Sequence, residues 1–203
     1  MLAQLFAIQR AIGEQLLADG WHASSIAIAA KPCSAWVLFD PSRQIRVHMR
    51  ADLADIMVQA STTHVPGRPL ESPLWTLTVH HAPVKAVIPA LLKAPAAIGG
   101  GTGRDRRAIG RMLTKTGMCP DRCHLVRALS GTATWFRPDR EAEATWTAPH
   151  RARVGGWQLL TSAVHLDATP NTPAAVLAPL ITAVEASAEG SSDHADHTVE
   201  WCL

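Results

Sequence analysis

The densest group of basic side chains follows a run of glycines near the middle of the chain. Its members are spaced by three or four residues: Arg104, Arg107, Arg111 and Lys115. On an α-helix this spacing places all four on one face. Such a face can bind the phosphates of a nucleic acid. It can equally be a solvated face opposite the apolar Ile109 and Leu113, so both interpretations stay open.

A second basic group lies in residues 43–50, where apolar and polar residues alternate. Successive side chains of a β-strand point to opposite faces, so the alternation predicts a strand with one apolar and one polar face. We expect the polar face to contact solvent or a ligand. Its basic residues are Arg46, His48 and Arg50.

Seven Trp against three Phe and no Tyr is an unusual choice of aromatic residues. Tryptophans on an antiparallel sheet can stack on unpaired bases. Large aromatic side chains are more often buried, which favours a core role for the repeated tryptophans. Those in question are Trp36, Trp75, Trp135 and Trp157.

Ten histidines and four cysteines raise the question of a metal site. The residues that could be combined into a tetrahedral site are Cys119, Cys123, His124, His194 and His197. Their spacing does not match a zinc-ribbon pattern. His80 and His81 are adjacent in an expected strand, so only one of them can face a given site. We therefore predict no metal ligands.

The sequence contains no recognisable catalytic motif. The Gly-rich residues 99–104 lack the spacing and the Lys-Ser/Thr pair of a phosphate-binding loop, which favours a flexible linker. A nucleophile elbow, a zinc-protease helix motif and a paired-carboxylate motif are also missing. Asp40 and Asp139 are interpreted as turn residues. The prediction is a protein without catalytic residues or cofactors, although an unrecognised enzyme site stays a weaker alternative.

Charge is distributed unevenly along the 203 residues. Five acidic residues and no Lys or Arg lie from Glu185 onward, so residues 1–184 hold 19 basic and 12 acidic side chains, a net charge of +7. A basic body with an acidic tail fits a polyanionic partner. No apolar run reaches the ~18 residues of a membrane span, and no signal peptide is evident. We expect a cytoplasmic protein with reduced thiols.

The elements that position these residues occur twice along the sequence. A Trp-bearing strand followed by an apolar helix with two prolines occurs in each half, with Pro83 and Pro89 in the first and Pro173 and Pro179 in the second. This pairing predicts an α+β fold of two tandem duplicated units. Each unit would consist of a helix, a small antiparallel sheet of three or four strands, and a C-terminal Pro-bearing helix. The predicted segments are 1–97 and 104–185 as units, 98–103 as a Gly-rich linker, and 186–203 as an acidic tail.

Several short motifs resemble the SPDY-domain family of Streptomyces, a domain of unknown function that is often duplicated. They are Trp36 with Asp40-Pro41-Ser42, Trp135 with Pro138-Asp139-Arg140, Trp146, Trp157 and Thr172-Pro173. In the first half Asp and Pro exchange order and Ala82 replaces the threonine. The resemblance implies an actinobacterial source, such as a plasmid or other mobile element. It brings no catalytic residues, because the family has no established activity.

Two functional hypotheses from different classes follow. The first is a non-enzymatic nucleic-acid-binding accessory protein of an actinobacterial mobile element, which prefers single strands and binds phosphates through both basic groups. The second is a protein-interaction module in which the tail, residues 186–203, docks on a partner through its apolar tip, Trp201-Cys202-Leu203.

Overall fold

The structure is a computed structural model and describes residues 2–24, 36–49, 55–60, 73–121, 131–138, 142–150 and 155–189. The helices of this part are α1 (Leu2–Ala18), α2 (Val84–Lys93), the short 3-10 helix η1 (Pro95–Ala97), α3 (Gly103–Lys115) and α5 (Ala174–Glu189). The strands of the first half are β1 (His22–Ser24), β2 (Trp36–Phe39), β3 (Ile45–Met49), β4 (Ile56–Ala60) and β5 (Trp75–His81). Those of the second half are β6 (Cys119–Pro120), β7 (Thr132–Phe136), β8 (Ala142–Thr147), β9 (Gly156–Thr161) and β10 (His165–Ala168).

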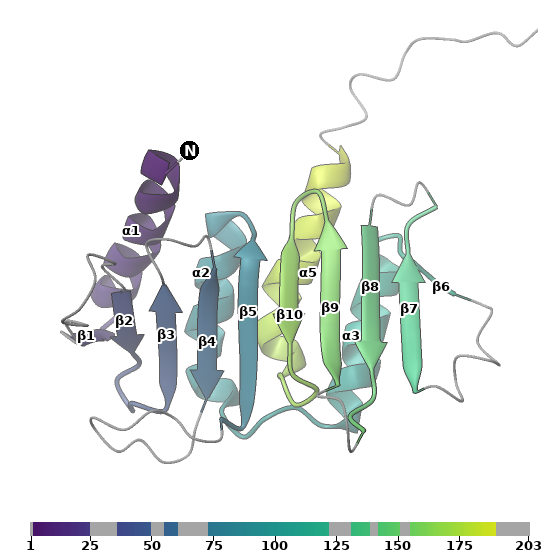
Figure 1. Ribbon diagram of the computed structural model, residues 1–203, viewed down its shortest axis with the longest axis horizontal. Helices are drawn as coiled ribbons and strands as arrows, with labels where there is room; N and C mark the ends of the chain where they lie inside the picture. Colours follow the sequence, from purple (N-terminus) through teal and green to yellow (C-terminus); the bar gives the residue numbers. More distant parts are fainter. Residues whose placement is uncertain are drawn as a thin grey trace, which may run out of the picture.

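All ten strands form one antiparallel sheet, in the order β1-β2-β3-β4-β5-β10-β9-β8-β7-β6 (Figure 1). The predicted fold class of two tandem units, each with its own sheet of three or four strands, is therefore wrong. Without the central pairing, β5 and β10 would each be edge strands that expose a row of backbone N–H and C=O groups. Their pairing satisfies these groups and makes the sheet continuous.

The junction between β5 and β10 is held by main-chain and side-chain bonds. Leu166 lies opposite Val79, and Asp167 lies opposite Thr78. Beyond the end of β10, the Thr76 carbonyl accepts hydrogen bonds from the Thr169 N–H (2.9 Å) and the Thr172 hydroxyl (3.0 Å). The start of α5 is thus fixed directly to β5.

The helices that the structure describes all lie on one face of the sheet (Figure 1). We call the opposite face, which none of these helices covers, the open face. Along each strand the residues facing the helices are buried, as in β3, where Ile45, Val47 and Met49 have no exposed surface. At the centre α2 packs against α5, while α1 contacts α2 and α3 contacts α5. Pro89 lies inside α2 and Pro179 inside α5, so the two proline-bearing helices predicted from the sequence are confirmed.

Two strands occupy segments for which the sequence predicted something else. From the sequence alone, residues 51–59 fit a short helix, but β4 occupies 56–60, where Ile56, Val58 and Ala60 alternate as buried residues. The sequence of residues 166–171 predicts a loop, but β10 includes the first three of them. The tail also begins later than predicted, because α5 continues to Glu189.

The Gly-rich segment before α3 packs closely against the segment before α5. The Gly101 N–H donates to the carbonyl oxygen of Asn171, and a Cβ atom on Gly101 would lie 2.8 Å from the Thr172 carbonyl oxygen. Gly100 has φ +79°, in the region that favours glycine. These glycines therefore let two loops approach each other at the start of α3 and α5.

Within the described ranges, none of the helices has the length and apolar character needed to cross a membrane.

Candidate functional site

Helix α3 is held in place at its N-terminus by one carboxylate. Thr102 and Asp105 form a capping box, in which the Thr102 hydroxyl accepts from the helix backbone and Asp105 accepts from the Thr102 N–H (2.7 Å). The other carboxylate oxygen of Asp105 accepts from the Ala174 N–H at the start of α5 (3.0 Å). Burial by itself raises the pKa of Asp105, but these hydrogen bonds outweigh it and lower the pKa. Asp105 thus ties α3 to α5 as an ionised side chain.

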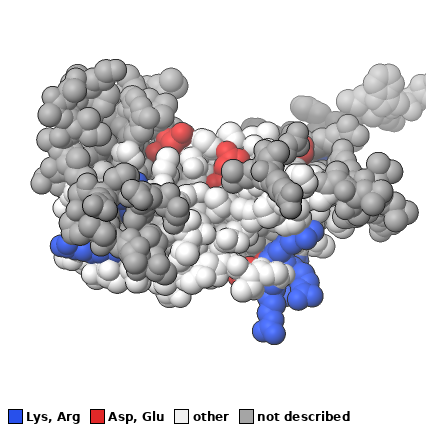
Figure 2. All heavy atoms as spheres, turned by 60° about the horizontal axis from the view of Figure 1, so that its bottom comes forward, with Lys and Arg blue, Asp and Glu red and all other residues white. Residues whose placement is uncertain are grey.

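The four basic residues predicted on this helix are all exposed, whereas Ile109 and Leu113 are buried on its other side. None of the four has an ion-pair partner among the residues that the structure describes. Figure 2 shows basic side chains gathered in one protruding group in the region of α3. The four predicted basic side chains therefore lie on an exposed face of α3.

A groove of about 930 Å³ runs between α3 and β7. It is lined by Gly103, Arg106, Arg107, Gly110, Arg111, Thr114, Lys115, Ala133 and Trp135. We call it the α3–β7 groove. Arg107, Arg111 and Lys115 of the predicted site border it, whereas Arg104 is not among its lining residues. The groove therefore combines positive charge with the partly exposed indole of Trp135.

Gly110 explains how the indole comes to lie beside the helix. A Cβ atom at Gly110 would be 3.1 Å from Cζ2 of Trp135, so a larger residue would push the ring away from α3. On its other side Trp135 contacts Trp157, with ring centroids 5.6 Å apart. The ring is thus fixed in position at the groove.

Arg106 also lines the groove, although it is not among the site residues predicted from the sequence. Its guanidinium lies 3.5 Å from the centroid of the Trp146 ring, a cation–π contact. Burial lowers the pKa of this guanidinium, which nevertheless stays charged at neutral pH. In the sequence, Gly103, Arg106 and Gly110 are spaced by three and four residues, so they lie on one face of the helix. The position of Arg106 on this face could have been predicted from that spacing.

The other predicted basic group lies elsewhere. Arg46 and His48 are partly exposed on β3, on the sheet face opposite the helices, and Arg50 lies outside the described residues. Arg46 donates to the side-chain oxygen of Gln59, and burial lowers its pKa. The predicted binding residues therefore do not form one surface, because the two groups are on opposite faces of the sheet.

The tryptophans divide between core and groove. Trp75 and Trp157 are buried, which confirms the core interpretation for both. Trp135 is partly exposed in the α3–β7 groove, so it is the one of the four with a described surface available for stacking. The side chain of Trp36 lies outside the described part.

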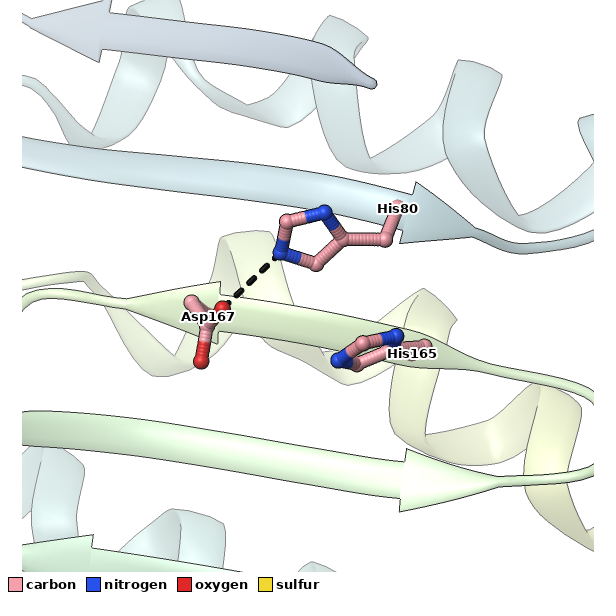
Figure 3. Close-up of side chains that lie close together, drawn as sticks. All are labelled: His80, His165 and Asp167. Carbon is pink, nitrogen blue, oxygen red and sulfur yellow. Dashed lines mark hydrogen bonds and ion pairs between the residues drawn. The ribbon is translucent and has the colours of Figure 1, made fainter. Parts of the chain in front are cut away.

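A separate polar cluster lies on the open face of the sheet, where His80 is held between two carboxylates. Its Nε2 is 2.8 Å from Oδ2 of Asp167 (Figure 3). Its Nδ1 is 2.9 Å from Oδ1 of Asp55. Burial alone lowers the pKa of His80, but the hydrogen bonds and charges of the two aspartates outweigh it and raise the pKa. The alternation of a strand predicts that His80 and His81 face opposite ways, and neither is among the site residues predicted from the sequence.

Of the five residues that could be combined into a tetrahedral metal site from the sequence, Cys119 alone lies in the described part, where it is an exposed free thiol. Cys123, His124, His194 and His197 lie outside it.

Comparison of the chain with protein-family models finds no match, and comparisons with curated proteins and with solved structures find none either. The resemblance to the Streptomyces SPDY-domain family therefore stays a prediction based on short motifs.

Proposed function

We propose that the protein binds single-stranded nucleic acid in the α3–β7 groove and catalyses no reaction. The observation that supports this most strongly is the placement of Arg107, Arg111 and Lys115 around the partly exposed Trp135. Proteins that bind single strands combine a cationic groove along the backbone with aromatic side chains on which bases stack. Both parts occur here within one groove.

A solvated helix face explains the charges but not the groove. Surface cations of an ordinary helix commonly pair with acids three or four residues away, as Arg10 does with Glu14 on α1 (2.7 Å). On α3 the single acid, Asp105, is engaged at the helix N-termini. Within the described part of the chain, the cations that border Trp135 therefore have no acidic partner and are exposed to an external anion.

The cellular setting is part of the same proposal. An exposed free thiol at Cys119 fits a reducing compartment, which favours the cytoplasm. The role as an accessory protein of an actinobacterial mobile element rests on the resemblance described above. The alternative of a protein-interaction module depends on residues 186–203, of which 190–203 lie outside the described residues.

The test is a fluorescence-anisotropy titration of a labelled single-stranded oligonucleotide at several salt concentrations. Each phosphate contact to a single strand contributes about 0.7 to the slope of log K against log salt. The double variant Arg107→Gln/Arg111→Gln should therefore reduce the slope by about 1.4 and weaken binding at 50 mM salt by about 10- to 60-fold.

The control is Lys85→Gln/Lys93→Gln, which removes the same charge from exposed positions of α2. This control variant should keep most of the slope of log K against log salt. Absence of binding by the unmodified protein at low salt rejects the proposal. Equal losses in the two double variants also reject it, since binding would then depend on net charge and not on the groove.

A further inference from the structure

His80, on β5, faces His165 and Asp167, both on β10, across the central strand junction (Figure 3). One ligand atom from each of the three residues lies within 4.8 Å of the other two. The His80 and His165 rings are 4.5 Å apart between centroids. All three side chains are partly exposed on the open face of the sheet, so an ion from solvent can reach them.

A β-bulge brings the two histidines together. Leu166 lies opposite Val79, but the next residue of β10, His165, lies opposite His81 and not His80. His80 is therefore the extra residue on β5, and its side chain points to the open face beside both His165 and Asp167. Bulges redirect side chains in this way and are frequent next to functional sites.

Neighbouring side chains orient His80 and Asp167 in the way that metal ligands are usually oriented. His80 binds Asp55 through Nδ1, which leaves Nε2 directed at Asp167 and at the centre of the group. A metal-bound histidine usually donates its second N–H to a carboxylate in this manner, which fixes the ring orientation. The second oxygen of Asp167 accepts from the side-chain amide of Gln158 (3.1 Å), so this carboxylate is oriented as well.

We propose that His80, His165 and Asp167 bind one divalent transition metal ion, with Asp55 as the carboxylate that orients His80. Two imidazole nitrogens and one carboxylate oxygen form a ligand set suited to Zn²⁺. Zn–N and Zn–O bonds of about 2.0–2.1 Å place tetrahedral ligands roughly 3.4 Å apart. Small side-chain rotations reach this spacing, because one donor pair is now at 2.8 Å and the others lie within 4.8 Å.

Three protein ligands leave a fourth position open to water or to a bound molecule. Asp167 also lines a groove of about 480 Å³ on the open face, together with the hydroxyl-bearing Thr76, Thr78, Thr145 and Thr147. The open position of the ion is therefore next to a polar groove. This site is on the opposite sheet face from α3 and is independent of the proposed nucleic-acid binding.

An ion pair of His80 with two aspartates explains part of this geometry without a metal. His165 distinguishes the two accounts, because within the described residues its imidazole contacts the His80 ring and is not bonded to either aspartate. Removing the His165 imidazole keeps the Asp55–His80–Asp167 network but deletes one metal ligand.

The experiment titrates Zn²⁺ into the full chain by isothermal titration calorimetry, after removal of metal with a chelator and dialysis. A parallel titration with Co²⁺ follows the visible absorption of the bound ion. We expect one ion per chain with the spectrum of a tetrahedral site. Asp55→Asn should weaken binding by about 10- to 100-fold, as for other outer-shell partners, and His165→Gln by more than about 100-fold.

His81→Gln is the matched control, because His81 neighbours the site in sequence and is not among its three ligands. The affinity of His81→Gln for Zn²⁺ should equal that of the unmodified protein. Circular dichroism confirms that each variant is folded. The proposal is overturned if the unmodified protein shows no saturable binding, or if His165→Gln binds Zn²⁺ as tightly as the unmodified protein.

Discussion

Replacing Leu166 with alanine is expected to lower the free energy of unfolding by about 2–5 kcal/mol, the range for large-to-small substitutions in a packed core. Leu166 is 1% exposed and lies on β10, where the two halves of the sheet join. Its side chain borders the same small cavity as Leu113 of α3 and Leu177 of α5. The loss of this side chain therefore weakens the contact between the central strands and both helices.

Leu160→Ala is the control for this prediction. Leu160 lies on the adjacent strand β9 but is 53% exposed on the open face, so the same substitution should change stability by no more than about 0.5 kcal/mol. Urea denaturation, followed by circular dichroism and tryptophan fluorescence, measures both variants. Equal effects of the two substitutions would contradict the central position of β10.

Trp135→Ala is expected to reduce the affinity for a single-stranded oligonucleotide by about 5- to 150-fold. Stacking of one base on an aromatic side chain contributes about 1–3 kcal/mol, and Trp135 is the described tryptophan that lines the α3–β7 groove. The charges of α3 stay in place in this variant, so the salt dependence of binding should change little. Anisotropy titrations over a range of salt concentrations measure both quantities.

Trp135→Phe is the matched variant for this second prediction. It keeps an aromatic ring beside Gly110 and should retain most of the affinity. Binding to a duplex of the same sequence should be affected little by either substitution, since paired bases are not available for stacking. An unchanged affinity of Trp135→Ala for the single strand would show that the groove binds phosphates without stacking.

Local patterns predicted the elements that are long or strongly periodic. In the sequence of residues 2–18, apolar residues recur at the spacing of one helix face, and this segment forms α1. The alternation in residues 43–50 corresponds to β3. The proline-bearing helices and the basic helix α3 also follow from spacing within one segment. These predictions succeed because the periods of a helix and a strand are properties of neighbouring residues.

One missed strand explains the wrong fold class. Strand β10 has four residues, includes the charged Asp167, and is followed by the turn residues Thr169, Pro170 and Asn171. So short a segment shows little periodicity, and its partner β5 is more than 80 residues away in the chain. If β10 is not recognised, no strand pairing joins the two halves of the sequence. The prediction is then two separate sheets.

The same strand explains why the His80 cluster was missed. Its members come together only when β5 and β10 pair and a bulge displaces the register. The basic residues of α3 were found because their spacing is local to one helix, whereas their relation to Trp135 and Arg46 depends on which face of the sheet each side chain occupies. Such relations follow from tertiary structure and not from sequence spacing.

Photo-crosslinking tests the proposed binding groove most directly. A single-stranded oligonucleotide containing bromodeoxyuridine would be bound to the full chain at low salt, irradiated, and the linked peptides identified by mass spectrometry. We predict crosslinks to Trp135 and to peptides from α3. Crosslinks confined to the open face of the sheet, such as to the β3 peptide that contains Arg46 and His48, would contradict the account.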